Sequence, residues 1–210
     1  MIAMLHVQEK AGCARQVGEA KRRLAGELLI LAHHYQRDEI AEVADFRGDS
    51  LELSRRAAAT DAGYIVFCGV RFMAETAAIL ARPDQRVLLP REEAGCFLAD
   101  QAEPTALQVA WEAVGAHGRA PLLPVTYINS SVEVKAFVGR HGGAVCTSAN
   151  AEKVLRWAFS QRPRVLFLPD QHLGRNMARR LGLSEEEIAL WDPRFPPRPE
   201  EFEPFRRRAK

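Results

Sequence analysis

The stretch Leu-Leu-Ile-Leu-Ala-His-His-Tyr, residues 28–35, decides the fold class. Its apolar part, residues 28–32, is too short for a helix and does not alternate polar with apolar residues. This pattern is typical of a strand buried on both faces, and such strands belong to parallel sheets covered by helices. The polar rings of His33, His34 and Tyr35 follow at once. Ligands of parallel sheets bind beyond the carboxyl ends of the strands, so this cluster is a candidate site.

Five further short apolar runs have the same character. They are residues 64–67, 87–89, 122–125, 144–146 and 165–168. Between them, apolar residues spaced three or four apart predict helices near residues 72–80, 107–114 and 154–159. Ser130 followed by Glu133 suggests a capping box for another helix through Val134 and Phe137. The alternation of strands and helices predicts parallel sheets with right-handed crossovers.

The six runs form two sets of three, separated near residues 100–104. We therefore expect an α/β fold of two three-layer α/β/α units with short parallel sheets. The expected domains are residues 1–100, carrying His33, Ser50 and Cys96, and residues 101–192. Residues 193–210 are rich in proline and arginine without apolar periodicity, which predicts a loop or frayed end.

Composition narrows the class of protein. The chain has 210 residues, of which 47% are hydrophobic, and a net charge of +2. This small charge gives no reason to expect nucleic acid or an anionic membrane as partner. No segment approaches the roughly 18 consecutive apolar residues of a membrane helix, and no signal peptide is recognisable. We expect a cytoplasmic protein.

Polar groups follow most of the predicted strands. Besides the first cluster, Tyr127 and Asn129 follow the run at 122–125, and Ser148 follows the run at 144–146. Gly-Asp-Ser at 48–50 precedes a helix-like stretch, where a hydroxyl and free N–H groups suit a phosphate or carboxylate. A turn with a helix cap explains the triplet equally simply, and the same alternative applies to Ser148.

The four cysteines are far apart and form no Cys-x-x-Cys pair, so disulfides are not expected. Cys96 lies among small residues in Ala-Gly-Cys, where a bulky group could approach its thiol. A zinc site made of His33, His34 and Cys96 is a weaker alternative, since adjacent side chains usually point apart.

Six ordered motifs together resemble the quinolinate synthase family. They are ILAHHYQRDEIAEVADFRGDSLELS (30–54), IVFCGVRFMAETAAIL (65–80), PREEAGCFLADQ (90–101), VTYINSSVEVKA (125–136), AVCTSANAEKV (144–154) and VLFLPDQHLGRN (165–176). The resemblance implies condensation of iminoaspartate with dihydroxyacetone phosphate to quinolinate, in the biosynthesis of NAD. It also implies three pseudo-symmetric α/β domains around a [4Fe–4S] cluster that acts as a Lewis acid.

The resemblance assigns roles residue by residue. Cys96 matches the first cluster ligand. His33 and Tyr35 match catalytic, substrate-contacting residues. The remaining matches to substrate-binding residues are Ser50, Tyr127, Asn129 and Ser148.

Two departures from the family pattern matter. His34 stands where the family usually has tyrosine. Family members also continue past a Trp-Asp-Pro segment, here residues 191–193, to motifs with two further cluster cysteines, which this sequence lacks. Three hypotheses follow: an enzyme or the first part of one, a cluster-free phosphate- or dicarboxylate-binding module, and an inactive fragment. The first implies a second chain that supplies the missing domain, and the uncovered face would favour self-association.

Overall fold

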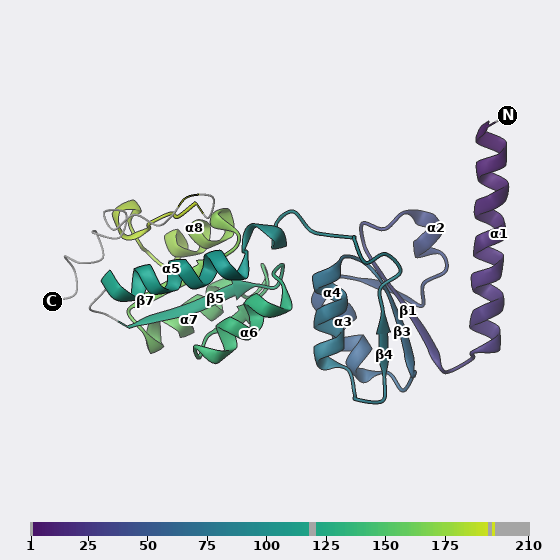
Figure 1. Ribbon diagram of the computed structural model, residues 1–210, viewed down its shortest axis with the longest axis horizontal. Coiled ribbons are helices and arrows are strands. Elements are labelled where there is room, and N and C mark those ends of the chain that lie inside the picture. The colour runs from purple at the N-terminus through teal and green to yellow at the C-terminus, as the bar shows by residue number, and fades with distance from the viewer. Residues whose placement is uncertain (1, 118–120, 193–194, 196–210) are drawn as a thin grey trace. The chain divides into compact units, whose positions relative to one another are not determined.

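The computed structural model describes residues 2–117, 121–192 and 195. The chain forms two compact units, residues 1–95 and 96–210. Each is a small parallel sheet flanked by helices, which confirms the predicted α/β class. Figure 1 shows the elements of each unit.

The first unit contains a four-stranded sheet in the order β2-β1-β3-β4. Its elements are α1 (Ile2–Arg23), β1 (Leu28–His33), α2 (Asp38–Ala41), β2 (Phe46–Gly48), α3 (Ser50–Ala59), β3 (Tyr64–Cys68), α4 (Arg71–Leu80) and β4 (Arg86–Leu88). All pairings are parallel; Leu31 lies opposite Phe46 and Phe67. Strand β1 is central and its middle residues are buried, as its apolar sequence predicts.

Helices α3 and α4 pack side by side on one face of this sheet (Figure 1). Leu53 and Ala57 of α3 are fully buried, as are Leu31 and Phe67 of the sheet. Helix α2 contacts β1. The N-terminal helix α1 contacts the rest of the unit near the C-terminal end of the helix, where Lys21 forms an ion pair with Asp45 at 2.7 Å.

The second unit contains a three-stranded parallel sheet in the order β6-β5-β7. Its elements are a 3-10 turn η1 (Ala99–Gln101), α5 (Pro104–His117), β5 (Leu122–Tyr127), α6 (Val132–Arg140), β6 (Ala144–Cys146), α7 (Ala151–Gln161), β7 (Arg164–Leu168), α8 (Gln171–Arg180) and a second turn η2 (Glu185–Glu187). The order of elements therefore repeats that of the first unit, with α5 through α8 taking the places of α1 through α4.

Two apolar clusters fill the second unit. One joins Leu123, Val125 and Leu155, where α7 and α8 cover the sheet. The other joins Leu107 and Phe137, where α5 and α6 lie together. Because successive residues of β5 alternate between the faces, this central strand contributes to both layers. The described part of the unit is thus a three-layer sandwich.

The structure corrects two sequence predictions and adds elements they omitted. Strand β2 was not predicted, so the described strands divide as four and three rather than three and three. Helix α6 is capped by Ser131, whose hydroxyl accepts from Val134 N, and not by Ser130. The Ser130 hydroxyl instead donates to the Tyr127 carbonyl at 2.9 Å. Helices α1 and α8 were also not predicted, and the predicted tail at 193–210 lies, except for Phe195, outside the described residues.

Among the described helices, none combines the length and the apolarity needed to cross a lipid bilayer.

Candidate functional site

The predicted site residues form two groups, one at the strand ends of each sheet. His33, Tyr35 and Ser50 belong to the first unit; Cys96, Tyr127, Asn129 and Ser148 belong to the second.

In the first unit, the polar residues gather where β1 and β2 end. His33 lies opposite Gly48 in the sheet register, which brings it beside the start of α3. The His33 and Tyr35 rings lie 4.0 Å apart between centroids, and His33 Nδ1 accepts from Tyr35 N at 3.5 Å. The Tyr35 hydroxyl reaches Met73 Sδ at 3.8 Å. The two aromatic rings therefore pack against each other, and more than half of the Tyr35 side chain is exposed to solvent.

The protonation of His33 follows from its surroundings. Burial lowers the pKa of His33 below its ordinary value, and His34 lowers it further, while Asp49 opposes both effects. A neutral imidazole is consequently the main form near pH 7. Such a ring can accept a proton or donate a hydrogen bond to a substrate oxygen.

Ser50 is the first residue of α3, but a neighbour occupies the amides at the helix start. The carboxylate of Asp49 accepts from Leu51 N at 2.9 Å and from Glu52 N at 2.8 Å. These N–H groups are the ones that would otherwise attract an anion. Asp49 is thus the helix cap that the alternative reading of Gly-Asp-Ser predicts. An anion bound by Ser50 would lie next to the negative carboxylate of Asp49.

In the second unit, three chain segments converge on one point. Asn129, just after β5, donates from Nδ2 to Cys96 Sγ at 3.7 Å. Tyr127, the last residue of β5, is hydrogen-bonded to the Ser148 side chain, and it lies within electrostatic range of Cys96 and Asp170. The strand-end rule thus brings together the residues it selected after β5 and β6, and the structure adds Cys96 from the segment before α5.

The phenol of Tyr127 is held neutral. Burial raises the pKa of Tyr127, electrostatic interactions with Asp170, Cys146 and Cys96 raise it further, and the Ser148 hydrogen bond opposes them. Tyr127 can therefore donate a hydrogen bond from its hydroxyl to a substrate carboxylate or phosphate at neutral pH. Ser148 is exposed and offers a second hydroxyl beside it.

Asp170 is the residue of this group that the site prediction omitted. It follows β7 and caps α8, since its carboxylate accepts from His172 N and Leu173 N at 2.9 and 3.0 Å. The strand-end rule selects its position after the run at 165–168, but the resemblance assigns it no role. Asn150 occupies the equivalent position before α7, where its Oδ1 accepts from Thr147 N at 2.7 Å. The start of α7 thus carries an amide side chain where α8 has the carboxylate of Asp170.

The cluster implied by the resemblance needs several thiolates. Cys96 is half-buried beside Asn129 and can supply one. Cys146 cannot supply another, because it is packed in the core and burial raises its pKa to about 12. Among the described residues, no three His, Cys, Asp or Glu side chains are grouped to hold a metal ion. The described residues thus fit one ligand of a cluster and not the set.

Comparisons with known proteins identify the relatives of this chain. The model of the family described as quinolinate synthetase A protein matches residues 15–196. A quinolinate synthase of Nocardioides is 54% identical over 183 residues, covering 83% of this chain and 46% of the relative. The quinolinate synthases of Bacillus pumilus and Bacillus subtilis are 52% and 51% identical, each over 179 residues and 85% of this chain, with 48% and 49% of their own lengths covered. The chain thus spans about half the length of the curated relatives it matches, and it belongs to the quinolinate synthase family.

Proposed function

We propose that this chain provides substrate-binding residues and one cluster ligand for quinolinate synthesis. The reaction condenses iminoaspartate with dihydroxyacetone phosphate, and water and phosphate leave as the pyridine ring of quinolinate closes. The observation that carries the proposal is the convergence of Cys96, Asn129 and the Tyr127–Ser148 pair in the second unit. It joins a thiol that can bind iron to neutral hydrogen-bonding groups that suit a small dicarboxylic acid.

Each residue has a role that its surroundings support. Tyr127 and Asn129 would orient the carboxylates of the substrate, and Ser148 would add a hydroxyl. In the first unit, neutral His33 would move a proton to or from a substrate oxygen, with Tyr35 beside it. Ser50 would contact the substrate through its hydroxyl, as a hydrogen-bond donor to an uncharged oxygen. Cys96 would ligate the cluster. When bound, the cluster would supply a Lewis acid that polarises a substrate oxygen or nitrogen.

The free thiols agree with a reducing compartment, so the proposal includes a cytoplasmic location. It also includes a partner, because Cys96 is the one thiol that the described residues place beside the candidate site, and one thiolate does not hold a cubane cluster. We propose that a second chain supplies the remaining ligands, and that the surface it would cover makes the isolated chain prone to self-association.

The test is complementation between two chains. The chain is produced anaerobically alone or with the unmatched second half of the Bacillus subtilis relative, and iron, sulfide and quinolinate are measured. We expect little cluster and little activity from the chain alone, and both from the pair. A near-stoichiometric cluster with turnover from the chain alone would refute the requirement for a partner.

Two cysteine variants sharpen this test. Cys96→Ser should abolish iron binding by the pair, whereas Cys13→Ser, an exposed cysteine of α1, should leave it unchanged. Loss of iron from both variants, or from neither, would contradict the assignment of Cys96. In the reconstituted pair, Ser148→Ala should weaken substrate binding about 10-fold, the scale of one hydrogen bond to a charged group.

A further inference from the structure

Asn129 lies at the centre of a three-residue turn that follows β5. Ser130 N–H donates to Ile128 O at 2.9 Å, which closes the turn around Asn129. Ile128 N–H donates to Cys146 O at 2.8 Å, so the first residue of the turn is fixed to the end of β6. From this turn the Asn129 side chain reaches the sulfur of Cys96. The contacts at the other end of the turn therefore decide where this amide lies.

Ser130 holds that end of the turn from inside the core. Its side chain is fully buried, and its hydroxyl donates to Tyr127 O at 2.9 Å. The bond folds the chain back onto the last residue of β5. Tyr127 O also accepts from the Thr126 hydroxyl at 3.2 Å, so this carbonyl has a partner without Ser130. What the Ser130 hydroxyl adds is a fixed position for the turn that presents Asn129.

Lys135 binds the same end of the turn from α6. Its ammonium donates a hydrogen bond to Ser130 O. Lys135 is the fourth residue of α6, close to the helix N-terminus, where the helix dipole disfavours a positive charge. Helix stability therefore gives no reason for a partly buried cation at this position, whereas its bond to the Ser130 carbonyl gives one.

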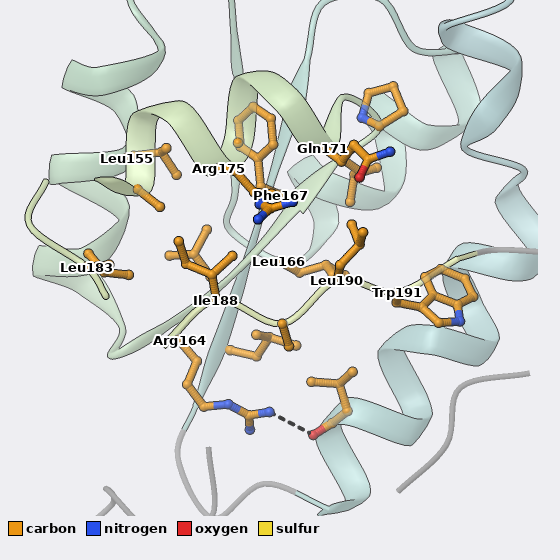
Figure 2. Close-up of a pocket in the computed structure, with 18 of the residues that line it drawn as sticks. Leu155, Arg164, Leu166, Phe167, Gln171, Arg175, Leu183, Ile188, Leu190 and Trp191 are labelled. Atoms are coloured by element: carbon orange, nitrogen blue, oxygen red, sulfur yellow. Dashed lines mark hydrogen bonds between the residues drawn. The ribbon is translucent and has the colours of Figure 1, made fainter. Parts of the chain in front are cut away.

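The turn is not held by the walls of a cavity. The second unit contains a mainly apolar cavity of about 580 Å³ along β7, and Figure 2 shows Leu166, Ile188 and Leu190 around it. Neither Tyr127 nor Asn129 lines this cavity. The position of the Asn129 amide depends instead on the hydrogen bonds of the turn itself.

We propose that Ser130 and Lys135 are positioning residues that hold the Asn129 amide against Cys96. Ser130 ties the turn to β5 and Lys135 ties it to α6, so the amide is in place before a ligand binds. The importance of this arrangement for substrate binding rests on the proposed function, whereas the contact between Asn129 and Cys96 does not.

Alkylation of the full chain by iodoacetamide at about pH 9.5 measures this contact. Exposed thiols are mostly ionised at this pH, so differences in rate report mainly on access to the sulfur and on its hydrogen bond. Peptide mass spectrometry gives the rate at Cys96 relative to the exposed Cys13 of α1. Asn129→Ala should raise this ratio about threefold, because the sulfur loses the amide that donates to it. Ser130→Ala should raise it to a similar extent, and the double variant should raise it no further.

Ser131→Ala is the matched control for Ser130→Ala. Ser131 caps α6 by accepting from Val134 N, so its loss destabilises the helix without removing the bond to the Tyr127 carbonyl. The Cys96 ratio should stay at its wild-type value in this variant. Lys135→Met should raise the ratio, and Lys135→Arg, which keeps a donor and its charge, should restore it.

An unchanged ratio in Asn129→Ala, Ser130→Ala or Lys135→Met would overturn the proposal, as would additive effects of the two alanines at 129 and 130. An equal rise in Ser131→Ala would also overturn it, because the unit would then have loosened as a whole. The measurement uses neither substrate nor cluster. It can therefore fail while iron binding and quinolinate formation by the pair of chains still support the proposed function, and it can succeed where they fail.

Discussion

The two sheets differ in the contact made by the residue that precedes the second strand of each unit, β2 in the first and β6 in the second. In the first unit, Asp45 precedes β2, and its carboxylate accepts from Ile30 N of β1 at 2.8 Å. In the second, Gly143 precedes β6 beside Pro124 of β5. The pairings of β1 with β2 and of β5 with β6 place these residues at equivalent positions.

The difference follows from what each backbone can donate. Ile30 has an N–H that needs an acceptor once it is buried, and Asp45 provides it while pairing with Lys21 of α1. Proline has no N–H, so Pro124 is tolerated in the central strand at this position, one residue before the pairing of β5 with β6 begins. The chain then approaches closely: a Cβ added to Gly143 would lie 1.9 Å from Pro124 O. One unit uses a polar contact where the other uses a close steric fit.

The largest expected effect on stability comes from adding a methyl group where Gly143 approaches Pro124. Gly143→Ala should destabilise the second unit by about 3 kcal/mol or more, because the new methyl group meets backbone that cannot rotate away. All three tryptophans, Trp111, Trp157 and Trp191, belong to this unit, so urea unfolding followed by tryptophan fluorescence reports it.

Gly139→Ala is the matched control for this variant. Gly139 lies inside α6, and a Cβ there would meet nothing within 4 Å. It should stabilise the unit by about 0.5–1 kcal/mol through helix propensity. Equal stability of the two variants would show that the approach of Gly143 to Pro124 is not constrained.

Loss of the hydrogen bond between Ile30 N–H and the Asp45 carboxylate should have the second largest effect on stability. Asp45→Ala leaves Ile30 N–H without its acceptor and removes the carboxylate that pairs with Lys21, whose ammonium keeps only its hydrogen bond to Val43 O. We therefore expect a loss of about 1–3 kcal/mol from the first unit. This unit has no tryptophan, and hydrogen exchange of peptides covering β1 is the appropriate measurement. Asp45→Asn keeps an acceptor oxygen and should cost less.

Asp61→Ala controls for removal of an aspartate that forms an exposed ion pair. Asp61 pairs with Arg82 on the surface at 3.5 Å and is fully exposed. Exposed pairs of this kind contribute little, so exchange in β1 should be unchanged. If Asp45→Ala were as harmless as Asp61→Ala, the carboxylate of Asp45 would have no structural role at Ile30.

The same contrast explains which elements the sequence could predict. The central strands β1 and β5 are buried along most of their length, and their apolar runs made them visible. Strand β2 has three residues, and Phe46 and Arg47 are exposed, so no apolar run marks it. It exists because β1 offers an edge to pair with, and pairing across 15 residues leaves no local pattern. The helix cap was misplaced by one residue because Ser130 is engaged by the Tyr127 carbonyl.

The candidate site was predictable in part for a related reason. Strand ends select residues by topology, and this rule found His33, Tyr127 and Asn129. It cannot show that Asn129 contacts Cys96, since 33 residues separate them and the contact depends on how η1 leads into the second unit. Nor could it show that Asp49, and not a bound anion, occupies the start of α3. Such contacts require the folded chain.

The smallest expected effect concerns protonation, where the strand ends of the two units again differ. Burial and His34 lower the pKa of His33 below 6.5, so the unfolded chain binds a proton there before the folded chain does. The stability contributed by neutral His33 is therefore present above pH 6.5 and is lost as the pH falls through the folded pKa. Tyr127 has a raised pKa and stays neutral throughout this range.

Acidification from pH 7.5 to 5.5 should consequently increase hydrogen exchange at the end of β1 more than at the end of β5. His33→Gln should reduce this pH dependence, because glutamine does not titrate, while His172→Gln, at an exposed histidine of α8 in the second unit, is the matched control. If His33→Gln left the pH dependence of β1 unchanged, burial of the imidazole would not be coupled to folding. The ring would then be free to take a proton without loosening the strand that holds it, as a residue that transfers protons to substrate requires.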